Sequence, residues 1–153
     1  MRDLIQYAFI LRRSLLRLLR VRTRGVKVML FDEAGDLLLI RNSYGDRNFF
    51  LLPGGGIRRG ESAAQAAARE VREELGLEIS NVEPVATYTS VAEGKRDTIH
   101  LFQATANDEP KVDGWEVVEA RFFPIDALPE QVSPATRRRI DELTGRRPRD
   151  GNW

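Results

Sequence analysis

The stretch ESAAQAAAREVREELGL (residues 61–77) predicts one helix with well-marked ends. Ser62 is a good N-cap residue, and Gln65, three residues later, completes a capping box. Five alanines around Gln65 favour helix strongly, and Gly76 suits the left-handed conformation that commonly follows a helix end. We therefore expect a helix between Ser62 and Gly76.

This helix carries three glutamates near its C-terminus, which is an unfavourable place for negative charge. Glu70 lies three residues before Glu73 and four before Glu74, so the like charges share one face and repel each other. The helix macrodipole also disfavours anions at this end. On a helical wheel the carboxylates lie beside an apolar arc that is expected to face the core, formed by Ala64, Ala67, Ala68, Val71 and Leu75.

Two interpretations of these glutamates are open from the helix alone. In the first, a divalent cation binds the carboxylates and removes the repulsion and the dipole penalty together. Oxygen ligands without histidine or thiolate favour magnesium or manganese. In the second, the glutamates form a solvated face in which Arg69 pairs with Glu73. The glycine-rich residues 53–61 favour the first interpretation, because glycines permit close approach of the backbone to a ligand.

The composition limits the classes of protein and site that the chain can form. Its 153 residues suggest one domain, and 42% hydrophobic with 31% charged residues is typical of a globular protein. A net charge of +1 gives no general attraction to nucleic acid, so DNA binding is not expected. The absence of cysteine excludes disulfides and zinc–thiolate sites, and the single histidine, His100, is expected to be structural.

The remaining sequence predicts an α+β domain. Apolar or alternating runs predict strands over residues 26–32, 36–42, 48–52, 82–91, 97–106 and 116–125. Ser133 before Pro134 predicts the start of a second helix that runs to about residue 144, with the arginines at 137–139 on a solvated face. Because strands and helices do not alternate regularly, a mixed sheet between helices is expected.

The two ends of the chain are expected to lie outside this domain of residues 23–145. Residues 1–22 predict an amphipathic basic helix, which packs on its own domain or in a homodimer, or lies on an anionic membrane surface; packing is the favoured alternative. Residues 146–153 predict a flexible tail. The apolar run near the start is too short and too charged for a signal peptide or a membrane span, so we expect a cytoplasmic protein.

Residues 55–77, GGIRRGESAAQAAAREVREELGL, match the pattern G-x5-E-x7-R-E-U-x-E-E-x-G-U at every specified position, where U is aliphatic. This segment resembles the Nudix box. The preceding FFLLPGGG also resembles the aromatic-x-x-Pro-Gly-Gly stretch common in that family, with Phe50 where tryptophan is frequent. The resemblance implies a Nudix fold, an α/β/α sandwich around a mixed β-sheet, to which the N-terminal helix would be an addition.

The resemblance further implies a magnesium-dependent hydrolase, with manganese as a substitute. It would cleave the diphosphate linkage of a nucleoside diphosphate joined to another moiety, a small-molecule substrate of the nucleotide type. Carried onto this sequence, the metal ligands would be the carboxylates of Glu70, Glu73 and Glu74 and the carbonyl of Gly54. Arg69 would orient a glutamate through a salt bridge. Glu61 would support the loop and a water of the metal.

The general base and the substrate contacts are less closely specified. The base is either a box glutamate, Glu70 or Glu73, or a residue outside the box, for which Glu116 is the first candidate and Glu109 and Glu93 are rivals. Arg58 and Arg59 lie in the box loop and could meet phosphates, although solvent exposure is the simpler interpretation. The aromatic residues that could stack on a base, or form core instead, are Phe50, Tyr44, Phe49 and Trp115.

Two other functions remain to be weighed against the hydrolase. A non-catalytic Nudix-fold module that binds nucleotides for regulation would usually have a damaged box, whereas this box is intact. A diphosphate isomerase on a similar scaffold would want a catalytic cysteine, and the chain has none. The sequence does not distinguish among nucleoside triphosphates, oxidised nucleotides, sugar nucleotides, dinucleoside polyphosphates and capped RNA as substrates.

Overall fold

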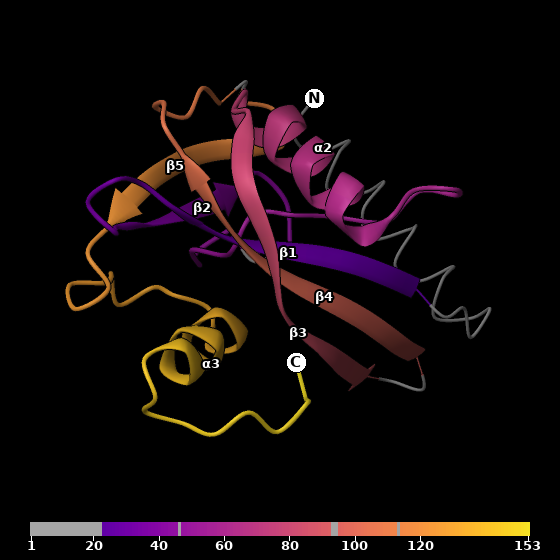
Figure 1. Ribbon diagram of the computed structural model, residues 1–153. Coiled ribbons are helices and arrows are strands. Elements are labelled where there is room, and N and C mark those ends of the chain that lie inside the picture. The colour runs from indigo at the N-terminus through magenta and orange to yellow at the C-terminus, as the bar shows by residue number, and fades with distance from the viewer. Residues whose placement is uncertain (1–22, 46, 93–94, 113) are drawn as a thin grey trace.

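The computed structural model describes residues 23–45, 47–92, 95–112 and 114–153. The helix expected within residues 1–22, and Glu93, therefore lie outside the described residues. A five-stranded sheet in the order β3-β4-β1-β2-β5 is covered by α2 on one face and α3 on the other (Figure 1). In chain order the elements are β1 (Thr23–Phe31), β2 (Leu37–Asn42), α2 (Ala63–Leu75), β3 (Ile79–Ala92), β4 (Lys95–Ala106), β5 (Val117–Phe123) and α3 (Pro134–Leu143).

The sheet is mixed, as predicted. β1 runs parallel to β4 along its whole length, from Thr23 opposite Asp97 to Phe31 opposite Thr105. The other pairs, β3 with β4, β1 with β2, and β2 with β5, are antiparallel. Within the described part of the chain, no helix is both long enough and apolar enough to cross a membrane.

Alternating side chains on the central strands build a separate core on each face of the sheet. On β1, Val28 and Leu30 are fully buried and belong to the core under α2, whereas Met29 belongs to the core under α3. The core under α2 includes Ala67, Val71 and Leu75 of that helix. The core under α2 fixes this helix and its glutamates against one face of the sheet.

The ends of α2 confirm the sequence prediction, and one detail of its apolar face is corrected. The capping box between Ser62 and Gln65 is complete, and Gly76 adopts the left-handed conformation with φ of 63°. The buried alanines are Ala66 and Ala67, however; Ala64, expected in the core, is exposed, and Ala68 is only partly buried. Compared with the predicted orientation, α2 therefore turns the side that carries Glu70 and Glu74 closer to the sheet.

The strand predicted over residues 48–52 is not formed. Only isolated bridges are present there, because Leu51 pairs with Ile40 of β2 while Phe50 turns to pair with Val132 near α3. Phe50 is only 8% exposed and packs edge-on against Phe123, with ring centroids 5.2 Å apart. The assignment of Phe50 to substrate stacking is therefore wrong: it is a core residue.

The C-terminal segment, expected to be a flexible tail, lies against β3 and α3 in the structure. Its backbone pairs with Thr89, and the Trp153 ring contacts Tyr88 edge-on at 5.7 Å. Arg139, expected on a solvated face, is 1% exposed. Its guanidinium lies 3.9 Å from the centre of the Tyr88 ring, donates to Glu142 and also donates to the carbonyl of Asn152.

Replacing Glu142 by alanine is expected to lower the free energy of unfolding by about 3–5 kcal/mol, because it leaves the buried Arg139 without its counter-charge. Chemical denaturation measures this change. The matched control is Asp141→Ala, which removes an exposed pair with Arg146 and should cost at most about 1 kcal/mol. Equal losses in the two variants would contradict a stabilising role for the buried pair.

Tyr88 gives the buried network a dependence on alkaline pH. Burial, together with the hydrogen bond that its hydroxyl donates to Glu142, raises the pKa of Tyr88 from 10.0 to about 12. The stabilisation is therefore complete below pH 10 and is lost as the pH rises through 12. Urea denaturation should show the stability advantage of wild type over Tyr88→Phe shrinking in that interval. An advantage that stays constant through pH 12 would contradict the assignment.

Candidate functional site

The glycine-rich loop lies where the sheet opens between β1 and β2. These strands meet only near their connecting turn, with Phe31 opposite Leu37. Farther along, the loop takes the place of a neighbouring strand: Val28 donates to the carbonyl of Pro53 and Val26 to that of Gly55, at 3.0 and 2.9 Å. The loop is thereby held within the sheet and beneath the C-terminal half of α2.

Gly54 and Gly55 allow this close fit. Gly54 has φ of 133°, and a Cβ there would overlap the Val26 carbonyl and lie 3.0 Å from the Cα of Lys27. A Cβ on Gly55 would lie 2.6–2.7 Å from the Glu70 carboxylate. The missing side chains therefore make room for the backbone at one position and for a glutamate at the next.

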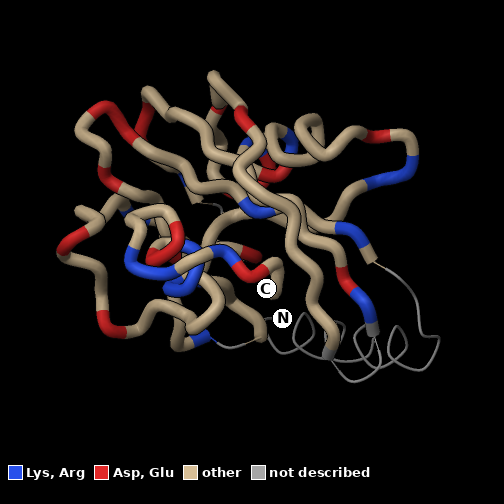
Figure 2. The backbone as a smooth tube through the Cα atoms, turned by 60° about the horizontal axis from the view of Figure 1, so that its bottom comes forward, with Lys and Arg blue, Asp and Glu red and all other residues tan. Residues whose placement is uncertain are grey.

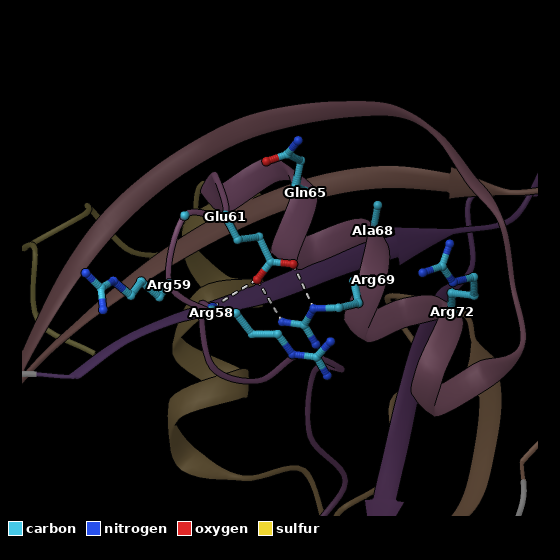
Figure 3. A pocket seen from close by; sticks show the side chains of 8 residues that line it. Arg58, Arg59, Glu61, Gln65, Ala68, Arg69 and Arg72 are labelled. Atoms are coloured by element: carbon cyan, nitrogen blue, oxygen red, sulfur yellow. Dashed lines mark hydrogen bonds and ion pairs between the residues drawn. The ribbon is translucent and has the colours of Figure 1, made fainter.

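Arg69 joins the loop to the helix. Its guanidinium is buried and donates to Glu61 at 2.7 and 3.0 Å (Figure 3). It also donates to Glu70 at 2.7 Å, to Glu73 at 3.0 Å and to the carbonyl of Gly56 at 2.8 Å. The hydrogen bonds from Arg69 to Glu61 hold the pKa of that carboxyl down at about 2, with a further contribution from the backbone amide of Arg58.

Glu74 lies in a different environment from the other glutamates. It is 9% exposed, and its carboxylate accepts the backbone N–H of Gly54 at 2.9 Å. Burial raises its pKa to about 7; the charges of Glu70 and Glu116 add to this shift, while Lys27 and the Gly54 hydrogen bond oppose it. Burial also lowers the pKa of Lys27, against the opposing effect of Glu74 and Glu70.

The sequence analysis missed Lys27, which the structure places beside this cluster. Its ammonium donates to the carbonyls of Leu52 and Gly54 at 2.8 and 3.2 Å. The available signal was a lysine inside the otherwise apolar run VKVML of residues 26–30. A partly buried lysine needs a nearby counter-charge or hydrogen-bond acceptors, and the glycine loop and Glu74 supply both.

The donor chemistry suits a hard divalent cation, because the cluster offers carboxylate oxygens without thiolate or imidazole. Across the described residues, however, the structure gathers no group of three or more acidic or histidine side chains close enough to hold a metal. Each box glutamate is instead engaged by an arginine or a backbone amide. Figure 2 shows the same intermixing of basic and acidic residues over the described backbone.

Two of the predicted metal ligands have other partners. Both oxygens of Glu61 accept hydrogen bonds, one from Arg69 alone and the other from Arg69 and the amide of Arg58. Glu61 therefore holds the loop, and the expectation that it also serves the metal stays a prediction. The carbonyl of Gly54 faces the Lys27 ammonium at 3.2 Å, so a metal would share this oxygen with a cation already present.

The structure distinguishes between the two described candidates for a general base outside the box, Glu116 and Glu109. Glu116 follows the exposed Trp115, and its loop is fastened to the end of β2 because its carbonyl accepts the Ser43 amide at 2.9 Å. The charge of Glu116 makes a small contribution to the raised pKa of Glu74, so Glu116 lies within electrostatic range of the cluster. Glu109 is exposed, and nothing links it to the box glutamates in the described residues.

The two box-loop arginines also differ in their contacts. Arg58 donates to both carboxylate oxygens of Glu73. Arg59 points away from Glu61 and is exposed (Figure 3). Both line a hollow of about 520 Å³ on the outer side of α2, next to Gln65, Ala68 and Arg72. The structure thus brings Arg58, but not Arg59, to the glutamate cluster.

The glycine loop yields a direct test of this geometry. Gly54→Ala is expected to lower the free energy of unfolding by about 2 kcal/mol or more, because the backbone is left-handed there and a Cβ would strike β1. The control is Gly56→Ala, where a Cβ meets nothing within 4 Å and the change should stay within about 0.5 kcal/mol. Similar denaturation midpoints for the two variants would rule out the tight packing of the loop on β1.

Comparison with known proteins agrees with this geometry. The model of the NUDIX domain matches residues 21–143. An isopentenyl-diphosphate Delta-isomerase of Streptomyces griseus is 35% identical over 147 residues, covering 80% of this chain and 73% of that protein. A Bacillus subtilis protein provisionally named 8-oxo-dGTP diphosphatase is 29% identical over 122 residues, covering 79% of each chain.

A further relative and a solved structure also match the chain. The NAD-capped RNA hydrolase NudC of Pseudomonas aeruginosa is 29% identical over 67% of this chain, which spans 36% of that protein. The crystal structure of a MutT NUDIX hydrolase from Burkholderia pseudomallei superposes with a TM-score of 0.72 at 23% identity, covering 80% of this chain and 98% of the other. The chain therefore belongs to the Nudix family and is, at the level of that family, a diphosphate-hydrolysing enzyme.

Proposed function

We propose that this protein is a magnesium-dependent hydrolase of a nucleoside diphosphate joined to another moiety. The observation that carries the proposal is the convergence of Glu70, Glu73 and Glu74 on the glycine loop, through Arg69 and the Gly54 amide. A diphosphate is itself polyanionic, so these carboxylates could accept it only with a bridging cation. Manganese would serve as a substitute because it prefers the same oxygen ligands.

The residues divide into those that hold the metal and those that hold the loop. Glu70, Glu73 and Glu74 would bind magnesium, with the Gly54 carbonyl as an additional oxygen. When bound, the ion would neutralise phosphoryl charge and lower the pKa of a coordinated water. Arg69 keeps the carboxylates turned toward the loop, and Lys27 balances the buried charge of Glu74 from below.

Proton removal from the attacking water needs a carboxylate near the cluster. Glu116 is our candidate, because its charge acts on Glu74 and its loop is fastened to β2 through Ser43. Box glutamates Glu70 and Glu73 are the alternatives, although both are ion-paired with Arg69. A base outside the box would leave all three box glutamates free to bind metal.

The relatives indicate that the substrate contains a diphosphate group. The named relatives act on 8-oxo-dGTP, NAD-capped RNA and isopentenyl diphosphate, which have the diphosphate group in common. Isomerisation is disfavoured here, since the chain has no cysteine to act in catalysis. Trp115, 48% exposed beside Glu116, is the aromatic residue best placed to meet a nucleobase once Phe50 is assigned to the core.

A hydrolysis panel with magnesium tests the proposal. The panel contains a nucleoside triphosphate, an oxidised nucleotide, a sugar nucleotide, a dinucleoside polyphosphate and a capped RNA, with product detected by chromatography. Glu74→Gln is expected to reduce turnover by about 100-fold or more while staying folded, because it removes charge from the metal site. Glu78→Gln, an exposed change close by in sequence, is the control and should keep wild-type turnover.

Two results would contradict this function. Equal turnover by Glu74→Gln and Glu78→Gln would remove the metal assignment. Nucleotide binding by the wild-type protein without hydrolysis of any compound would favour the regulatory binding module instead.

A further inference from the structure

Arg58 occupies a carboxylate that the proposed reaction requires for metal. Its terminal nitrogen lies 3.0 and 3.1 Å from the two oxygens of Glu73. Both side chains are accessible, with 62% of Arg58 and 44% of Glu73 exposed. A magnesium ion and this guanidinium would therefore compete for the same oxygens.

The backbone of Arg58 is fixed while its side chain is not. Its amide donates to Glu61 at 2.9 Å, and the neighbouring Ile57 amide donates to the carbonyl of Arg24 at 3.0 Å. Among the described residues, Glu73 is the only ion-pair partner of the Arg58 guanidinium. The side chain can thus leave Glu73 without any change in the loop.

Arg69 could not make the same exchange. It also contacts Glu73, but it is buried and holds Glu61, Glu70 and the Gly56 carbonyl as well. Its release would break several hydrogen bonds and leave buried charged groups without partners, which is strongly unfavourable. Of the two arginines on Glu73, Arg58 is therefore the one that a metal ion can displace.

A displaced Arg58 has an adjacent place to go. It lines the hollow of about 520 Å³ beside the box loop, together with Arg59 and Arg72 (Figure 3). The guanidinium groups of Arg59 and Arg72 make no ion pair with any of the described residues. Arg58, Arg59 and Arg72 would together attract a phosphate to this hollow. The planar guanidinium of Arg58 also suits bidentate contact with phosphate oxygens.

We propose that Arg58 is an exchangeable cation, which neutralises Glu73 in the free enzyme and transfers to a substrate phosphate when magnesium takes Glu73. This inference rests on the proposed function. Metal and phosphate binding then reinforce each other. Magnesium on Glu73 releases Arg58 for the phosphate, and phosphate on Arg58 releases Glu73 for the magnesium. Arg58 is then a positioning residue for the diphosphate and a competitor of the metal in its absence.

The first experiment measures magnesium binding by calorimetry on the full chain without substrate. An exposed ion pair is worth up to about 1 kcal/mol, so Arg58→Ala should bind magnesium about 2- to 5-fold more tightly than wild type. The matched control is Arg72→Ala, which removes an equal charge next to Glu73 in sequence but no ion pair. Its magnesium affinity should differ from wild type by less than about 1.5-fold.

The second experiment measures hydrolysis at saturating magnesium with the best substrate of the panel. Arg58→Ala should raise KM by about 10-fold with little change in kcat, which is the effect of losing a charged contact made equally in the ground and transition states. Arg58→Lys keeps the charge without the bidentate fork and should raise KM less. Thermal unfolding of each variant verifies that it is folded.

The outcomes separate this inference from the proposed function. Wild-type protein that binds no magnesium would overturn both. Magnesium binding that is unchanged in Arg58→Ala, or tightened equally in Arg72→Ala, would overturn the exchange alone. An unchanged KM in Arg58→Ala would refute the transfer to phosphate, even if the metal affinity had increased.

Discussion

The guanidinium of Arg69 is the contact on which the site depends. It links the box loop, through Glu61 and the Gly56 carbonyl, to the carboxylates of Glu70 and Glu73 on α2. Because it is buried, its charge must be matched closely, and these partners use its donors fully. Loop and helix therefore have one shared geometry, fixed before any ligand arrives.

The cations around the helix end answer the charge problem raised by the sequence. Arg69 and Arg58 pair with the outer glutamates, and Lys27 lies near the buried Glu74. In the free protein these groups supply the positive charge that a metal would otherwise provide. The two interpretations of the glutamates are thus compatible, since ion pairing describes the free state and metal binding the proposed active state.

Local signals in the sequence predicted local structure well. Ser62, Gln65 and Gly76 place the ends of α2 because capping depends on residues within one turn. Contacts between distant segments had no such signal. The residues around Phe50 were predicted to form a strand, but their backbone pairs partly with β2 and partly with the segment before α3. Arg139 is buried because it contacts Tyr88 and Asn152, which lie far from it in the sequence. Lys27 was missed for the same reason, since its acceptors lie about 25 residues away.

The insertion of the glycine loop between β1 and β2 has a consequence for cooperativity. Its carbonyls accept amides of β1, and Leu51 exchanges hydrogen bonds with Ile40 of β2, so the loop occupies the position of a missing central strand. Local opening of such a segment would break the sheet in the middle instead of fraying it at an edge. The glycine loop should therefore share the protection of the hydrophobic core against amide exchange, unlike the mobile loops that carry many active sites.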